Sequence, residues 1–278
     1  MAESTELLEI KNLCISFKNG TQEVPTLHNV NISLKPGELV TIVGESGSGK
    51  TITVRSILGL LKSPPTIYTA GNILYKGKDL LKNNKDDWRA IRGKEISMVF
   101  QDPMTALNPV FTIGEQMMNV YLYQGKKRRI SWFSRPTKAM RLAAKDRAIE
   151  LLEKMHLPDP EGILNRYPFE LSGGMRQRIV IALALIHTPK LLIADEPGTA
   201  LDVTVQMSIN QELQRLVKEE GISMLYITHN LGVAKEMGER TYVMQYGKVV
   251  EEGLTEDVFL NPQQEYTKEL LAALPKLV

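Results

Sequence analysis

The sequence contains a single cysteine, Cys14, and no cluster of cysteine and histidine residues at metal-ligand spacing. One cysteine excludes an internal disulfide, as expected of a protein in a reducing compartment. No apolar run approaches the ~20 residues that a membrane-spanning helix needs, and the start of the chain lacks the basic and apolar segments of a signal peptide. We therefore expect a cytoplasmic protein that reaches a membrane only through partners.

An excess of charge of one sign is also missing. The 34 Lys and Arg against 32 Asp and Glu leave a net charge of +2 over 278 residues, of which 43% are hydrophobic. This balance is typical of a folded globular chain. No linker rich in Gly, Ser or Pro separates two halves. The chain is therefore expected to form lobes inserted into one another.

Two apolar patterns predict an α/β fold with two kinds of sheet. Apolar and polar residues alternate in 7–17 and 30–34, which is typical of antiparallel strands with one solvated face. Continuous apolar runs at 39–43, 191–194 and 224–228 are typical of strands buried on both faces of a parallel sheet. Helical patterns such as 143–157 lie between the first two runs, and they predict an inserted helical lobe.

The segment GESGSGKT directly follows the apolar run at 39–43 and precedes the helix-compatible ITVRSILGL. Strand, glycine-rich loop and helix together match the phosphate-binding pattern G-x-x-x-x-G-K-[ST]. Its backbone N–H groups are expected to surround phosphate oxygens, with Lys50 at the β- and γ-phosphates and the Thr51 hydroxyl on Mg²⁺. The nucleotide-binding residues predicted in this loop are Gly44, Glu45, Ser46, Gly47, Ser48, Gly49, Lys50 and Thr51.

A pair of acids, Asp195 and Glu196, ends the apolar run in LLIADEP. A parallel sheet delivers catalytic side chains to the carboxyl ends of its strands. There Asp195 would hold the hydration shell of Mg²⁺, and Glu196 would orient or deprotonate the attacking water. Taken alone, the pair could also cap a following helix.

The segment LSGGMRQR, from Leu171 to Arg178, opens the apolar helix pattern IVIALALI. It resembles the signature sequence of ATP-binding cassette (ABC) proteins, and the resemblance extends from about Leu7 to Leu274. In that family the signature turn binds the γ-phosphate of the ATP held by the opposite subunit, through a serine hydroxyl, glycine N–H groups and the helix dipole. The residues that would serve the partner's ATP are Leu171, Ser172, Gly173, Gly174 and Met175.

The same resemblance assigns further roles in the family order. Gln101 would sense Mg²⁺ and connect the helical lobe to the membrane part of the transporter, and His229 would contact the γ-phosphate. With Glu196 these form the expected catalytic set, while Thr51, Gln101 and Asp195 form the expected Mg²⁺ set. The D-loop would consist of Ala200, Leu201 and Asp202, with Asp202 bridging the dimer.

Phe17 precedes Gly44 by about the spacing at which the family places an aromatic that stacks on adenine. Stacking on adenine would contribute a modest aromatic contact. An aromatic residue on a half-buried strand is also typical of a hydrophobic core, so both interpretations stay open.

The segments VFQDPMTALNPVFTIGEQ and YTKELLAALP resemble the ATPases of oligopeptide, dipeptide and nickel importers of bacteria and archaea. Gly198, Asn230 and Phe169 depart from the usual family residues, but none removes a group assigned to chemistry. Many relatives continue into a cysteine-bearing extension that can hold an iron–sulfur cluster. This chain stops before it, so no such cluster is expected.

The resemblance implies a P-loop ABC nucleotide-binding domain over 1–258, with a mixed β core, an antiparallel β subdomain and a helical subdomain inserted at about 103–180. A short helical tail would occupy 259–278. The implied function is ATP hydrolysis that powers uptake of peptides or a related small solute, at the cytoplasmic face of the cell (inner) membrane. Expected partners are a second, non-identical ABC ATPase, two permeases and an extracytoplasmic substrate-binding protein; no nucleic acid is expected.

Several alternatives remain at this point. The importer could carry nickel, other metal chelates or glycosides, because selectivity lies in its partners. An exporter, a regulatory subunit that does not hydrolyse ATP, and an ABC ATPase acting on DNA or ribosomes are also open. The last class generally carries long coiled-coil inserts or two cassettes in one chain, and neither is visible in the sequence.

The segment from Lys126 to Arg147 holds nine Lys or Arg against one Asp. Within it, 126–141 includes four consecutive cations together with Trp132 and Phe133. A solvated loop and helix face is the simple interpretation. A site for anionic lipid headgroups is the alternative, at about 1 kcal/mol for each cation near the surface.

Overall fold

The structure is a computed structural model and describes residues 6–123, 136–198 and 201–273. The basic segment 126–135, including Trp132 and Phe133, and Ala200 of the expected D-loop lie outside the described residues. The chain divides into two compact units. The first combines Met1–Trp88 with Ser223–Val278, and the second is the continuous segment Arg89–Ile222.

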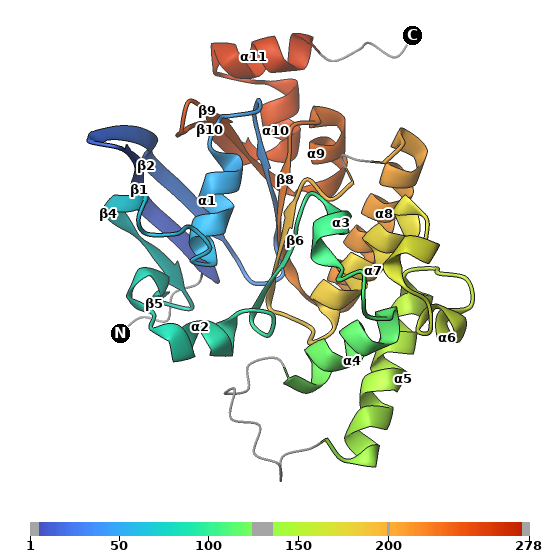
Figure 1. The fold of residues 1–278 in the computed structure, drawn as a ribbon. Helices are drawn as coiled ribbons and strands as arrows, with labels where there is room; N and C mark the ends of the chain where they lie inside the picture. Colours follow the sequence, from blue (N-terminus) through green and yellow to red (C-terminus); the bar gives the residue numbers. More distant parts are fainter. Residues whose placement is uncertain (1–5, 124–135, 199–200, 274–278) are drawn as a thin grey trace. The chain divides into compact units, whose positions relative to one another are not determined.

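The first unit contains two sheets (Figure 1). A four-stranded antiparallel sheet has the order β2-β1-β4-β5. Its strands are β1 (Leu8–Asn19), β2 (Gln22–Leu34), β4 (Thr66–Tyr75) and β5 (Lys78–Asp79). Alternating burial along β1 and β2 agrees with the alternating apolar pattern that predicted them.

The second sheet of this unit is mixed. Its strands are β3 (Leu39–Val43), β8 (Ser223–Thr228), β9 (Arg240–Gln245) and β10 (Lys248–Leu254). β3 lies between β8 and β9 and is parallel to both, while β10 is antiparallel to β9. Every residue of β3 and β8 is buried, as their continuous apolar runs predicted.

Helices connect and extend these strands. They are α1 (Lys50–Ile57), α2 (Lys85–Ile91), which crosses the boundary between the units, α9 (Leu231–Met237), α10 (Thr255–Leu260) and α11 (Glu265–Ala272). A hydrophobic cluster joins α9, α10 and α11 to β3 and β9 through Val43, Leu231, Ala234, Val243, Val258 and Tyr266. The last helix is thereby fixed to the strand that leads into the predicted phosphate loop.

The second unit is mainly helical. Its two parallel strands are β6 (Ile96–Val99) and β7 (Leu191–Asp195). Its helices are α3 (Pro103–Ala106), α4 (Ile113–Tyr123), α5 (Lys138–Lys154), α6 (Pro160–Ile163), α7 (Gly173–Leu185) and α8 (Val203–Glu219). Ala148, Leu151, Leu152 and Met155, which the sequence places on one helical face, are all buried. Among the described residues, no helix is both long and apolar enough to cross a bilayer.

Candidate active site

The predicted phosphate loop lies between β3 and α1 and begins at Gly44, which has a φ of 149°. A Cβ at Gly44 would lie 2.2 Å from the Met244 carbonyl oxygen, so a side chain cannot be accommodated there. Gly49 caps α1 with a φ of 104°, and a Cβ there would lie 2.7 Å from Leu27. Gly44 is therefore required by the close approach of the β9 backbone, and Gly49 by its positive φ. The side of the loop at Gly47 is open, since a Cβ there would meet nothing within 4 Å.

Lys50 is buried at the centre of this loop and is 5% exposed. Its Nζ donates to the carbonyl oxygens of Gly44 at 2.7 Å and Glu45 at 2.8 Å. It also lies 3.4 Å from the Ser48 hydroxyl. The ammonium group thus holds the loop closed around itself through backbone acceptors. These are neutral acceptors, so phosphate oxygens can replace them with a stronger charge-assisted contact.

His229 follows β8 directly, and Val43 at the end of β3 is in register with Thr228 at the end of β8. Parallel pairing therefore places His229 and the start of the phosphate loop at adjacent strand ends. Asn230 caps α9, and its side chain accepts from Gly232 N–H at 2.9 Å and Val233 N–H at 3.3 Å. An asparagine thus provides the cap at the position where the family commonly has aspartate.

Phe17 lies on β1, paired with Val24 and Thr66, and is partly exposed. Its ring therefore belongs to the antiparallel sheet of the first unit. This placement is compatible with both of the interpretations that the sequence left open.

Gln101, Asp195 and Glu196 come together in the second unit. β6 and β7 pair in parallel, with Val99 opposite Ala194, so the residues after both strands share one edge. There the Gln101 amide donates to Glu196 Oε2 at 3.1 Å. Asp195 is only 3% exposed.

The backbone of Glu196 has a φ of 50°, in the left-handed region that non-glycine residues seldom adopt. Such strained residues persist only where the surrounding structure holds them in place, and they are concentrated at functional sites. Gly198, where the family usually has threonine, has a φ of 136° and so needs glycine's freedom. The turn after β7 therefore has a backbone that the sequence motif alone does not reveal.

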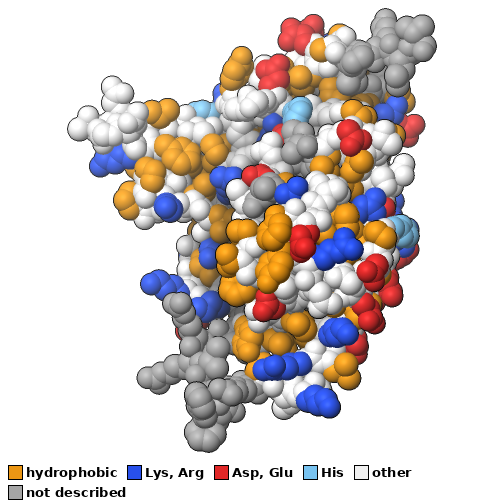
Figure 2. Space-filling view, turned by 45° about the vertical axis from the view of Figure 1, so that its right-hand side comes forward, with side chains coloured by type: hydrophobic (Ala, Val, Ile, Leu, Met, Phe, Trp, Pro, Cys, Tyr) orange, Lys and Arg blue, Asp and Glu red, His pale blue; other side chains and the backbone are white. Residues whose placement is uncertain are grey.

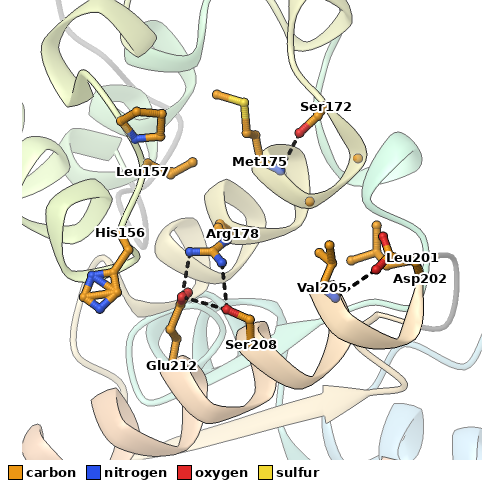
Figure 3. Close-up of a pocket in the computed structure, with 13 residues that line it drawn as sticks. His156, Leu157, Ser172, Met175, Arg178, Leu201, Asp202, Val205, Ser208 and Glu212 are labelled. Carbon is orange, nitrogen blue, oxygen red and sulfur yellow. Dashed lines mark hydrogen bonds and ion pairs between the residues drawn. The ribbon is translucent and has the colours of Figure 1, made fainter.

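The signature turn and the described D-loop residues, Leu201 and Asp202, line one open pocket of about 710 Å³ (Figure 3). Ser172 caps α7, and its hydroxyl accepts from Met175 N–H at 3.3 Å. Asp202 caps α8 in the same way, accepting from Val205 N–H at 3.0 Å. Cβ atoms added to the two signature glycines, Gly173 and Gly174, would lie 3.2 Å from Leu201 and 2.9 Å from Val205. The glycines thus permit close contact between the two segments.

Arg178, the last residue of the signature segment, has a role that sequence reasoning missed. It forms an ion pair with Glu212 at 2.7 Å and donates to the Ser208 hydroxyl at 3.1 Å (Figure 3). It also donates to the carbonyl of Met155, which caps α5, at 2.6 Å. Arg178 thereby connects α5, α7 and α8. In the sequence, Arg178 is marked only as the last residue of LSGGMRQR, and its partner Glu212 belongs to no motif.

The comparisons with known proteins agree with this geometry. A family described as ABC transporter matches residues 27–199. The oligopeptide transport ATP-binding protein OppD of Bacillus subtilis is 47% identical over 277 residues, which is 100% of this chain and 74% of that protein. The dipeptide transport ATP-binding protein DppD of the same organism is 43% identical over 272 residues, which is 98% of this chain and 78% of that protein.

Among solved structures, an ATP-binding cassette that forms a dimer in a post-hydrolysis state with ADP and Pi is similar with a TM-score of 0.73 and 31% identity. The similarity covers 89% of this chain and 98% of that one. The P-loop, the paired strand ends and the signature turn therefore have a common explanation: this chain belongs to the ABC transporter family and is an ATPase of that family.

Proposed function

We propose that this chain hydrolyses ATP to power the import of oligopeptides or dipeptides through partner permeases. The peptide substrate is supported by the names of the relatives, which are peptide transport ATP-binding proteins at 43–47% identity. The observation that carries the chemistry is the contact between Gln101 and Glu196 at the joint edge of β6 and β7. Uptake of nickel chelates or glycosides is the alternative for the cargo.

In this proposal the loop 44–51 holds the phosphates of ATP, with Lys50 turning from its backbone acceptors to the β- and γ-phosphates. Glu196 orients or deprotonates the attacking water, and Gln101 positions the Glu196 carboxylate through the bond between them. His229, beside the loop in strand register, serves the γ-phosphate, and Phe17 stacks on the adenine.

The donor set proposed for Mg²⁺ consists of the Thr51 hydroxyl, the Gln101 amide oxygen and, through water, the Asp195 carboxylate. These hard oxygen donors, few in number, suit an ion that keeps several waters and binds phosphate oxygens. Asp195 is a nearly buried carboxylate at the end of β7. The ion would supply positive charge to neutralise the β- and γ-phosphate oxygens.

The working unit that we propose is a dimer of two cassettes, in which Leu171–Met175 and Asp202 serve the ATP of the other subunit. The proposed domain has a cassette at 1–258, a helical subdomain at about 103–180 and a helical tail at 259–278. Figure 2 shows hydrophobic side chains between charged ones on the face that it presents. In the second unit Val110 and Phe169 are each 71% exposed, and they suit contact with the permeases at the cytoplasmic membrane surface. A substrate-binding protein would deliver the peptide.

The test uses the assembled transporter in liposomes. Glu196→Gln keeps the size of the side chain and one acceptor oxygen for the Gln101 amide but removes its basicity, so we expect ATP to bind while turnover falls by at least a hundredfold. Lys50→Ala should instead abolish ATP binding. Turnover at the native rate in the Glu196→Gln transporter would contradict the role of Glu196. Uptake of a labelled oligopeptide, compared with uptake of Ni²⁺, decides the cargo.

A further inference from the structure

Helix α11 lies far from the phosphate loop in sequence but contacts it in the first unit. Tyr266, in the first turn of α11, is 9% exposed and belongs to the hydrophobic cluster that includes Val43, the last residue of β3. Leu270, one turn later on the same face, packs against the cluster too. The apolar face of α11 is thus buried against the strand that leads into the loop.

The hydroxyl of Tyr266 accepts a hydrogen bond from the backbone N–H of Glu45 at 3.1 Å. Glu45 is the second residue of the phosphate loop, 221 positions earlier in the chain. The ring is held by apolar packing and the hydroxyl reaches the loop, an arrangement well suited to tyrosine.

With this bond, both backbone polar groups of Glu45 have a hydrogen-bond partner. The Glu45 carbonyl accepts from Lys50 Nζ at 2.8 Å and from Ser48 N–H at 3.2 Å. Further along, Gly247 N–H donates to the Ser48 carbonyl at 2.9 Å. When Lys50 turns to a phosphate, Tyr266 still holds the Glu45 N–H.

We propose that Tyr266 is a positioning residue for ATP binding: by holding the Glu45 N–H it keeps the phosphate loop in its nucleotide-binding conformation and makes ATP affinity depend on α11. This inference rests on the proposed role of the loop 44–51 as the phosphate site. A loop that is already shaped for its ligand loses less conformational entropy on binding, so its affinity is higher.

The test compares Tyr266→Phe with the wild type in the full chain, by isothermal titration with Mg²⁺-ATP. Phenylalanine keeps the packing of the ring and removes only the hydroxyl. We expect the dissociation constant for ATP to rise about three- to tenfold, as for the loss of one hydrogen bond. The Glu45 amide should also exchange its hydrogen faster in the variant.

Burial raises the pKa of the Tyr266 hydroxyl, so the hydroxyl stays neutral. The difference in ATP affinity between Tyr266→Phe and the wild type should therefore be constant from pH 6 to pH 9.

Tyr242→Phe is the matched control. Tyr242 is also buried in the first unit, but its hydroxyl accepts from Ser33 N–H at 3.0 Å and from Arg240, not from the loop. We expect this variant to lose stability and keep the wild-type ATP affinity. A purely structural role of Tyr266 predicts the same result for both variants.

Unchanged ATP affinity in Tyr266→Phe, or equal changes in both variants, would overturn the proposal. If Tyr266→Phe failed to fold, hydrogen exchange in the wild type would decide, because a Glu45 amide that exchanges as fast as an unprotected one is incompatible with the bond. The Lys50→Ala variant distinguishes this outcome from failure of the proposed function. If Lys50→Ala bound ATP as tightly as the wild type, the loop 44–51 would not be the phosphate site.

Discussion

Glu38, which precedes β3, is held by a two-point contact with Arg240 at the start of β9. Arg240 Nε lies 2.8 Å from Oε1 of Glu38 and a terminal guanidinium nitrogen lies 3.1 Å from Oε2. The Lys35 N–H donates to the same carboxylate at 2.7 Å. Burial alone would raise the pKa of Glu38, but the hydrogen bonds from Arg240 and Lys35 outweigh it and lower the pKa.

Because the pKa of Glu38 is lower in the folded protein than its usual value of 4.5, the carboxylate stabilises the fold above pH 4.5. This contribution is lost as the pH falls below 4.5 through the folded pKa. We expect Glu38→Gln to lower the free energy of unfolding by roughly 1 to 3 kcal/mol near pH 7. The difference from the wild type should shrink below pH 4.5.

Urea unfolding of both proteins between pH 3.5 and pH 8 measures this difference. Glu23→Gln, at an exposed position on β2, provides the control and should change stability little at any pH. A Glu38→Gln difference as large at pH 3.5 as at pH 7 would contradict the assignment.

Helix α8 carries two acidic residues, one nearly buried and one exposed. Glu212 is paired with Arg178 of α7 at 2.7 Å, and the two side chains are 10% and 16% exposed. Glu219 is paired with Arg215 one turn away at 3.0 Å, and those side chains are 50% and 40% exposed. A buried pair leaves an uncompensated charge when one partner is removed, whereas an exposed pair contributes little.

We therefore expect Glu212→Gln to lower the free energy of unfolding by about 2 kcal/mol or more. Glu219→Gln, the same substitution on the same helix, should cost at most about 0.5 kcal/mol. Guanidinium unfolding followed by circular dichroism measures both. Equal losses would show that the connection between α7 and α8 through Arg178 is not a stabilising one.

The buried strands are the elements that the sequence predicted best. All residues of β3, β7 and β8 are buried, so these strands consist almost entirely of apolar residues, with Thr41 and Asp195 among the exceptions. β4 was not predicted, because Gly71 interrupts its pattern. A Cβ at Gly71 would lie 2.4 Å from the Asn12 carbonyl oxygen, where the pairing of β1 and β4 shifts register. Glycine is required at position 71 by the register shift in β1, which cannot be recognised from the sequence of β4 itself.

In the candidate site, too, features formed by contiguous residues were predictable from the sequence, and contacts between distant residues were not. The phosphate loop and the signature turn are contiguous segments, so the sequence could predict a glycine-containing turn before a helix at both places. The left-handed backbone of Glu196, the Arg178–Glu212 pair and the bond from Glu45 to Tyr266 depend on residues brought together by folding. No spacing within the sequence indicates such contacts.

Two helix caps should contribute similarly to stability, but only one of them lies in a segment expected to bind ATP. Ser172 caps α7 in the signature turn and accepts from Met175 N–H at 3.3 Å. Thr137 caps α5 and accepts from Met140 N–H at 3.2 Å. Replacing either by alanine removes a similar cap, at a cost of about 1 kcal/mol in stability.

We expect only Ser172→Ala to reduce ATP hydrolysis by the assembled transporter, by about tenfold or more, because its hydroxyl would serve the ATP of the opposite subunit. ATP binding to the isolated chain should be unchanged in both variants. Steady-state phosphate release in liposomes measures the effect. Equal activity of the two variants would argue against a shared site.

The first unit is formed by two segments of the chain that are translated at different times, Met1–Trp88 and Ser223–Val278. β3 is parallel to β8 and β9, which begin at Ser223 and Arg240, so neither neighbour exists when β3 leaves the ribosome. The second unit, Arg89–Ile222, is continuous and is translated in full before those strands. Since domains generally fold as units in order of synthesis, the inserted unit can fold first. β3 and the phosphate loop that follows it would therefore lack both neighbouring strands until β8 and β9 have been translated.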